Sequence, residues 1–139
     1  MSIGQVEDRL AIRELVETFA IGVMRKDTGM WASTWAEEGS WKIPLKEEPA
    51  VGKSNMIAVL EEIMARNKFV SMSSFPTELV IEGNKAHGKA YAQELIFPRD
   101  GGQRILVGCF EDKYVKRDGR WYFLSRVYES LFRSAIPAE

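Results

Sequence analysis

The sequence predicts an α+β fold in which three N-terminal helices pack on one face of a curved antiparallel sheet. Apolar residues first recur every three to five positions, as in amphipathic helices, and from Phe69 onward every second position, as in half-buried strands. The dipeptide Asp118-Gly119 lies between two alternating arms and supplies the positive φ that a tight hairpin needs. Because the helices precede hairpin-linked strands, the order is typical of α+β proteins.

Length and composition favour a single domain over residues 1–139. The chain has 45% hydrophobic residues, enough for one core, and its 19 basic and 20 acidic residues leave it near neutral. Nucleic acid is therefore not an expected partner, because no basic run or stripe could follow a phosphate backbone. No apolar stretch approaches the roughly 20 residues that span a membrane, and the first residues are charged. We therefore expect a cytoplasmic location and no membrane partner. The single Cys109 is expected to be a small buried hydrophobe.

The first segment predicts one long amphipathic helix. Its N-terminus has two candidate capping residues, Ser2 and Gln5. The expected inward stripe consists of Val6, Leu10, Leu15, Val16, Phe19, Val23 and Met24.

Two further helices are expected before the sheet. Asp27 follows a break in the pattern and can cap a short helix in which Trp31 and Trp35 lie one turn apart. A short strand at residues 41–44 and a loop lead to a third helix after Gly52. Its expected inward face consists of Met56, Val59, Leu60, Ile63 and Met64.

The remaining chain predicts strands at residues 69–74, 78–82, 85–97, 103–116 and 121–128, with a loosely ordered tail after about residue 132. The strand 85–97 is informative because one of its sides is small and apolar, which favours a hollow beneath a curved sheet. Glu94 lies on that side, with Ala86, Gly88, Ala90 and Ala92. Desolvation there would raise the pKa of Glu94 and favour proton transfer, unless a cation such as Arg126 holds it ionised in a structural ion pair.

The hairpin register decides which acid neighbours Arg126. A two-residue loop at Asp118-Gly119 places Glu111 opposite Arg126, whereas a three-residue loop places Phe110 there with Asp112 diagonal. Both registers put a carboxylate within reach of Arg126.

Several segments together resemble the SnoaL-like domain of the nuclear-transport-factor-2-like superfamily. They are the start at residues 8–15, the segment between Trp31 and Trp41, Gly52 before the third helix, and the hairpin Asp112-x-Tyr114…Asp118-Gly119-Arg120-Trp121…Arg126. The resemblance implies a cone of curved sheet around an apolar pocket, and commonly a dimer or trimer. It also implies proton-transfer chemistry of the kind catalysed by polyketide cyclases, scytalone dehydratase and hexachlorocyclohexane dehydrochlorinase.

The dehydratase and dehydrochlorinase members use an Asp–His dyad, in which the His acts as base. An ungapped comparison places the Asp at Met24 and the His at Ser71, so the resemblance implies a chain without this dyad. The only histidine, His87, lies on the strand side opposite the small residues and is expected to face outward.

The resemblance also assigns the pocket. Its polar residues would be Ser71, Glu94, Arg126, Tyr128 and Ser130, and its apolar walls Phe19, Ala20, Met24, Trp41, Leu60, Met64, Ala92, Leu106 and Phe110. Two functions remain open. The chain either binds a small hydrophobic or aromatic molecule without catalysis, or is a proton-transfer lyase, isomerase or cyclase in which Glu94 moves a proton while Arg126 and Tyr128 stabilise an oxyanion.

No metal and no cofactor are expected. The chain has one histidine, and no pair of its carboxylates has the spacing of metal ligands.

A homodimer is expected, formed through an outward strand face that carries His87, Tyr91 and Phe97.

Overall fold

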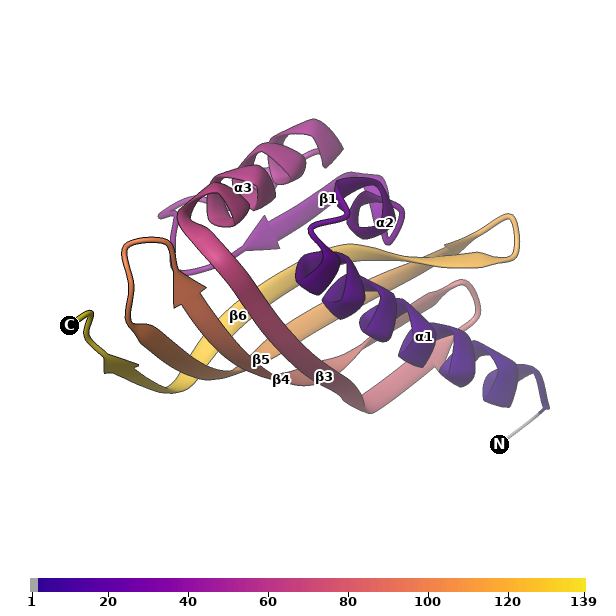
Figure 1. Ribbon diagram of the computed structural model, residues 1–139. Helices are drawn as coiled ribbons and strands as arrows, with labels where there is room; N and C mark the ends of the chain where they lie inside the picture. Colours follow the sequence, from indigo (N-terminus) through magenta and orange to yellow (C-terminus); the bar gives the residue numbers. More distant parts are fainter. Residues whose placement is uncertain (1–2) are drawn as a thin grey trace.

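A curved six-stranded sheet with three helices over its concave face forms the structure (Figure 1), a computed structural model that describes residues 3–139. The elements are α1 (Ile3–Arg25), α2 (Thr28–Ala32), β1 (Trp35–Lys42), β2 (Ala50–Val51), α3 (Lys53–Arg66), β3 (Asn67–Glu82), β4 (Lys85–Pro98), β5 (Gln103–Arg117) and β6 (Arg120–Ile136). The strand order is β2-β1-β6-β5-β4-β3, and all neighbours are antiparallel except β1 and β6. The predicted α+β class is confirmed.

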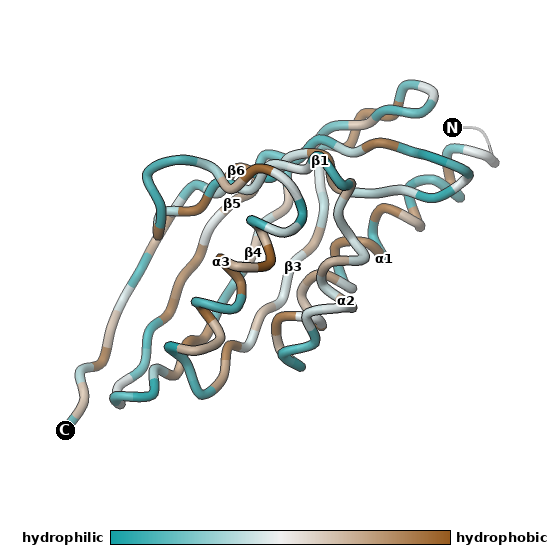
Figure 2. The backbone as a smooth tube through the Cα atoms, turned by 90° about the horizontal axis from the view of Figure 1, so that it is seen from above, coloured by the Kyte–Doolittle hydropathy of each residue, from teal (hydrophilic) through white to brown (hydrophobic). Residues whose placement is uncertain are grey.

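The helices cover the sheet because each buries one apolar stripe. Viewed from above, α1, α2 and α3 lie side by side over the strands (Figure 2). The stripe of α1 differs from the prediction near its start, since Val6 and Leu10 are exposed and Ile12 is fully buried instead. Gln5 lies inside α1 rather than before it, and Ser2 is outside the described residues. No helix in the described part of the chain is long and apolar enough to cross a membrane.

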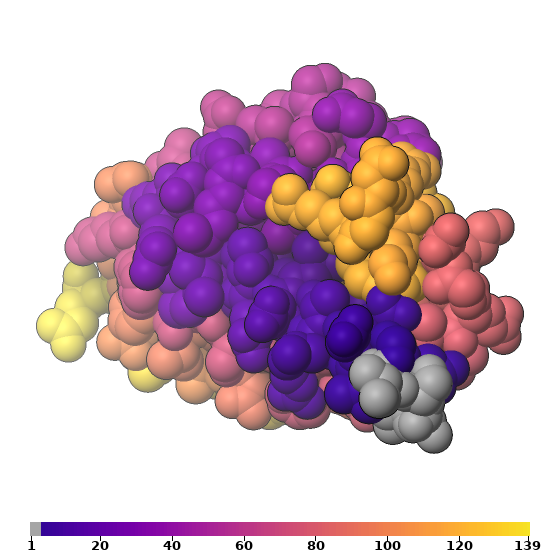
Figure 3. All heavy atoms as spheres, turned by 90° about the vertical axis from the view of Figure 1, so that its right-hand side faces the viewer, coloured from indigo at the N-terminus to yellow at the C-terminus, as the bar shows by residue number. Residues whose placement is uncertain are grey.

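The β5–β6 hairpin holds the first half of α1 against the sheet. Its tip lies beside α1 in the space-filling view (Figure 3). Asp8 on α1 accepts hydrogen bonds from Trp121 Nε1 at 2.9 Å and from Lys116 Nζ at 3.0 Å. The bond from the Trp121 indole and the Lys116 charge lower the pKa of Asp8. These contacts fix how α1 crosses the sheet.

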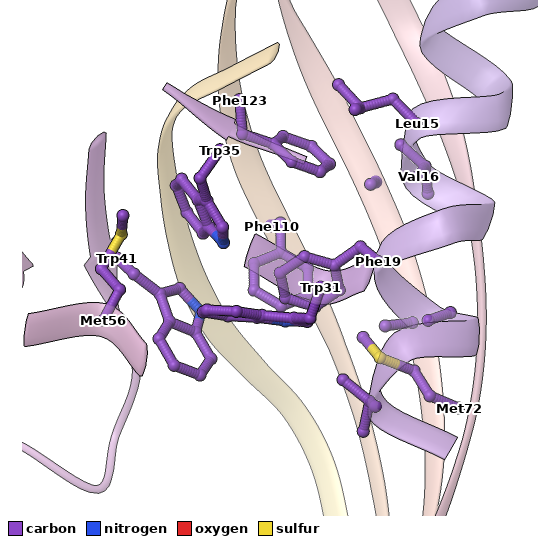
Figure 4. Packing of buried hydrophobic residues seen from close by; sticks show 14 of the residues in the cluster. Leu15, Val16, Phe19, Trp31, Trp35, Trp41, Met56, Met72, Phe110 and Phe123 are labelled. Atoms are coloured by element: carbon purple, nitrogen blue, oxygen red, sulfur yellow. The ribbon is translucent and has the colours of Figure 1, made fainter. Parts of the chain in front are cut away.

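A cluster of three indoles fills the interior where α1, α2 and β1 meet (Figure 4). Asp27 caps α2 as predicted, accepting a hydrogen bond from the Met30 amide at 3.0 Å. The prediction that Trp31 and Trp35 share that helix is wrong, because α2 ends at Ala32 and Trp35 begins β1. Their rings still pack 5.8 Å apart, and the Trp31 and Trp41 rings lie 4.9 Å apart.

Several strand boundaries differ from the prediction. Residues 69–74 and 78–82 belong to one strand, β3, which stays continuous through an irregularity between Thr77 and Val80 where Glu78 adopts a φ of 52°. The first strand starts at Trp35 rather than Trp41, since it pairs with β6. Where a loosely ordered tail is predicted after about residue 132, β6 continues to Ile136, because β5 provides pairing partners that far.

The hairpin register matches neither alternative, although the loop is the two-residue one. Arg117 pairs with Arg120 across Asp118-Gly119, whose φ angles are 50° and 76°. Between Lys113 and Tyr114 the register shifts because β6 contains one extra residue, so Asp112 lies directly opposite Arg126. Without this bulge Arg126 would face outward, since alternate strand residues point to opposite sides.

Candidate functional site

A cavity of about 620 Å³ lies between the concave face of the sheet, α1 and α3. This size suits a small organic molecule. Exposed side chains mark its mouth: Leu45 after β1, Arg66 at the end of α3, Arg104 at the start of β5 and Arg133 near the end of β6. The rest of the wall is mostly apolar, with Phe19, Val23, Trp41, Ile43, Pro44, Leu60, Ile63, Val70, Met72, Ile96, Leu106, Phe110 and Ala135.

Strand pairing explains why one face of the sheet supplies the cavity floor. Residues directly opposite one another on neighbouring strands share a face. Two such rows cross the four long strands, and every member of both lines the cavity. They are Met72–Glu94–Leu106–Arg133 and Val70–Ile96–Arg104–Ala135.

Among the residues that the structure describes, Glu94 is the only one that brings a carboxylate to the lining. Its neighbours in the row are Met72 and Leu106, so its side chain projects from an apolar floor. It is half-buried and makes no hydrogen bond or ion pair with another described residue. Burial raises the pKa of Glu94 to about 7, opposed by the positive charge of Arg126. A carboxyl group with such a pKa can both take and give a proton at neutral pH.

Tyr128 is the second titratable group beside the floor. Burial and the negative charge of Glu94 raise the pKa of the Tyr128 phenol to about 12, so it stays a hydrogen-bond donor at neutral pH. Its ring packs edge-on against Phe110, with centroids 5.2 Å apart. Gly108 on the neighbouring strand leaves the space for the ring, because a Cβ there would collide with the far end of the Tyr128 side chain.

We expect Gly108→Ala to displace the Tyr128 ring and to lower the free energy of unfolding by about 1 kcal/mol, as overpacking does. The cost is small because the colliding atoms belong to the movable end of the side chain. Chemical denaturation of a double-mutant cycle with Tyr128→Ala checks this. The same Gly108→Ala change should cost nothing measurable once the ring is gone. An equal cost in both backgrounds would show that Gly108 serves the backbone rather than Tyr128.

Arg126 lies beneath the cavity and does not line it. Its Nε donates to Asp112 Oδ1 at 2.7 Å and its Nη2 to Asp112 Oδ2 at 3.0 Å, while the Tyr114 hydroxyl donates to the same Oδ2 at 3.1 Å. The guanidinium lies 3.8 Å from the ring centroid of Phe110 and 4.2 Å from that of Phe123. Both partners of the ion pair are fully buried.

The ion pair leaves Glu94 without a cation in contact. Burial raises the pKa of the Asp112 carboxyl, and the Arg126 charge together with the hydrogen bonds from Arg126 and Tyr114 opposes that rise. Burial and the Asp112 charge also raise the pKa of Tyr114. Because Arg126 donates its two hydrogen bonds to Asp112, it affects Glu94 only through its positive charge.

The structure brings together eight of the residues assigned from the sequence. The cavity lining includes Phe19, Trp41, Leu60, Glu94, Leu106, Phe110, Tyr128 and Ser130. The lining does not include Ala20, Met24, Met64, Ser71, Ala92 and Arg126.

Helix and strand phase explain the differences. On β3 the side chains that face the cavity are those of Val70 and Met72, so the alternate residue Ser71 points to the other side of the sheet. On α1 the lining residues are Phe19 and Val23, and Met24, the neighbour of Val23, is not among them. The three arginines of the mouth were not assigned. Alternation along β5 places Arg104 on the same face as Leu106, whereas Arg133 reaches the inner face because a second register shift, between Val107 and Gly108, adds one residue to β6.

A family model described as a SnoaL-like domain matches residues 4–127. The chain belongs to the SnoaL-like domain family. The match includes β1 to β5, the first part of β6 and most of the cavity wall. None of the curated proteins matches this SnoaL-like domain in sequence.

Solved structures agree with the fold of the SnoaL-like domain. A type 2 hexachlorocyclohexane dehydrochlorinase superimposes with a TM-score of 0.87 at 18% identity, covering 96% of this chain and 91% of that one. A scytalone dehydratase-like protein of Novosphingobium aromaticivorans gives 0.85 at 17% identity, covering 100% and 94%. A type 3 dehydrochlorinase of Novosphingobium barchaimii gives 0.82 at 19%, covering 95% and 92%. At these identities the likeness shows the shared fold alone.

Proposed function

We propose that this SnoaL-like domain binds a small hydrophobic or aromatic molecule in its cavity and that Glu94 exchanges a proton with it. The observation that carries the proposal is a lone carboxyl group on an apolar cavity floor, free of ion pairs with described residues, with a pKa near 7. A structural ion pair with Arg126 would have argued for a purely structural Glu94, but Arg126 pairs with Asp112.

The proposed chemistry does not use the Asp–His dyad of the dehydratases and dehydrochlorinases. Met24 and Ser71 stand at the dyad positions in the ungapped comparison, and their cavity-facing neighbours Val23, Val70 and Met72 carry no titratable group. The only histidine, His87, is exposed on β4 outside the lining. Glu94 takes the place of the base in this proposal.

The step we propose is removal of a proton by the Glu94 carboxylate from a carbon or hydroxyl of the ligand. The electron pair of the broken bond then forms a new π bond, which either expels a leaving group or places negative charge on a ligand oxygen. Tyr128 donates a hydrogen bond to that oxygen, and Glu94 returns its proton to the leaving group or to another carbon. This describes a lyase, isomerase or cyclase. Arg126 contributes through its charge, without contact with the ligand.

Native mass spectrometry of freshly purified protein tests the binding part of the proposal. We expect a fraction of the chains to carry a small apolar molecule whose release restores the mass of the free chain. The same molecule should be converted by the wild-type protein and not by Glu94→Gln. Conversion at equal rates by both would remove Glu94 from the mechanism and leave a binding function.

We also propose that the outer sheet face pairs two copies of the chain. This face gathers exposed apolar side chains, among them Leu95 and Ile105, which are paired neighbours on β4 and β5. Its aromatic pairs include Phe69 with Phe97 and Phe75 with Tyr91. A contiguous apolar patch of this kind is typical of an interface with another protein surface.

Sedimentation at micromolar concentration should give twice the 15.8 kDa mass of one chain. Leu95→Lys should yield monomers, because a cation would be buried in the proposed interface. As a matched control, Leu10→Lys on the exposed side of α1 should leave the dimer intact. A monomeric wild-type protein would contradict the assembly without affecting the cavity.

A further inference from the structure

Three arginines surround the mouth of an otherwise apolar cavity. Arg66 is paired, since its Nη2 donates to Glu62 Oε1 at 2.9 Å. Arg104 and Arg133 make no hydrogen bond or ion pair with another described residue. Two guanidinium groups therefore line the entrance without a counter-charge from the described chain.

Sheet geometry brings these two arginines to the same place. Arg133 lies opposite Leu106 and Arg104 lies opposite Ala135, so Arg104 and Arg133 are diagonal neighbours on one face of β5 and β6. Diagonal neighbours across two strands are about 7–8 Å apart, which long side chains easily span. Both side chains can thus converge on one group placed between them.

An anion is the group that such a pair binds best. The planar guanidinium offers parallel N–H donors that match the two oxygens of a carboxylate, and two adjacent cations repel each other until a negative charge lies between them. Apolar walls directly inside the mouth require that the rest of the same ligand be hydrophobic.

We propose that Arg104 and Arg133 bind a terminal carboxylate of the ligand, so that the ligand class of this cavity is an amphipathic organic acid. The inference rests on the proposed function and deepens it. Glu94, Leu106 and Arg133 occupy one row across three strands, so Glu94 and Arg133 are about 10 Å apart at the backbone. The apolar body of the ligand therefore lies between its carboxylate and the carbon or hydroxyl that meets Glu94.

The test uses the neutral fluorophore N-phenyl-1-naphthylamine as a cavity probe and displaces it with decanoate or with decanol. For each protein we compare the concentration of decanol that displaces half of the probe with the concentration of decanoate that does so, at a pH where decanoate is ionised. The ratio of decanol to decanoate concentration measures the preference for the acid. In Arg104→Gln/Arg133→Gln this preference for the acid should fall about tenfold or more, because charge-assisted hydrogen bonds are lost. Arg13→Gln, which removes an exposed arginine of α1 outside the lining, should leave the ratio unchanged.

The outcomes separate the two proposals. An unchanged ratio in the double variant, with both compounds still displacing the probe, overturns the carboxylate site and leaves the apolar cavity standing. Failure of both compounds to displace the probe from the wild-type protein overturns both proposals. Repeating the displacement in Glu94→Gln keeps the readout independent of proton transfer, and the preference for the acid should persist there.

Discussion

Replacing Arg126 with Met should lower the free energy of unfolding by about 3–5 kcal/mol, because it leaves the buried Asp112 carboxylate without its cation. Asp112→Asn should be similarly destabilising, since the Arg126 guanidinium would remain enclosed without a counter-charge. The faces of Phe110 and Phe123 compensate for only part of that charge. Denaturant unfolding followed by tryptophan fluorescence measures the loss.

Two controls identify the origin of this loss. The triple variant Asp112→Leu/Tyr114→Phe/Arg126→Met removes both charges and the hydroxyl that would lose its acceptor, and it should recover most of the stability. Glu38→Gln breaks the exposed pair with Arg117 and should change stability little. A triple variant as unstable as Arg126→Met would show that the loss comes from packing, and not from an uncompensated charge.

Glu94→Gln should slow proton transfer in the cavity by about 10². A probe independent of the natural substrate is 5-nitrobenzisoxazole, whose C3 proton passes to a base while the N–O bond breaks to give a nitrile and a phenolate. The wild-type rate should rise with pH through a midpoint of about 7, the pKa of Glu94. Because a positioned base contributes about 10² or more to the rate, Glu94→Gln should lose about that factor. Glu111→Gln, on the exposed side of β5, should keep the full rate and the same profile.

The same substitution should stabilise the protein in alkaline solution, which separates lost chemistry from lost folding. The folded state holds the Glu94 proton more tightly than the unfolded chain, whose carboxyl titrates near 4.5. Stability therefore falls as the pH rises from about 4.5 to about 7, and the penalty remains above that range. Glu94→Gln should remove a penalty on the order of 3 kcal/mol at pH 8 and change little below pH 4. A destabilised variant at pH 8 would contradict a desolvated carboxylate.

The helix and strand periods were sufficient to predict the fold class. Asp27 could be recognised as a cap, and the side assignment of β4, with Ala86, Ala90 and Ala92 inward and Glu94 facing the cavity, followed from alternation alone. Local patterns are reliable here because each element buries only one face.

The tertiary pairing was less predictable. Nothing near Leu124 distinguishes the residue where β6 bulges, and this bulge decides that Asp112, rather than Glu111 or Phe110, faces Arg126. The pairing of β1 with β6, which begins at Trp35, is likewise a long-range contact without a local signal. The bulge explains why Arg126 points into the protein and pairs with Asp112.

Predicting the candidate site required both the local sequence pattern and the pairing of distant strands. Glu94 was found from strand parity, whereas Ser71 was assigned from the ungapped comparison even though the alternation of Val70 and Met72 points those two residues inward. Arg104 and Arg133 can be recognised as a pair of adjacent cations only when β5 and β6 are known to be neighbouring strands.

Titration of Glu94 itself tests the central claim most directly. The side-chain carboxyl carbons of protein labelled with ¹³C-glutamate can be followed by NMR between pH 3 and pH 10, with the Glu94 signal assigned by its absence in Glu94→Gln. Our account predicts a midpoint near 7 for this signal, while those of exposed glutamates stay near 4.3. A Glu94 midpoint at or below about 4.5 would contradict a proton-exchanging carboxyl group on the cavity floor.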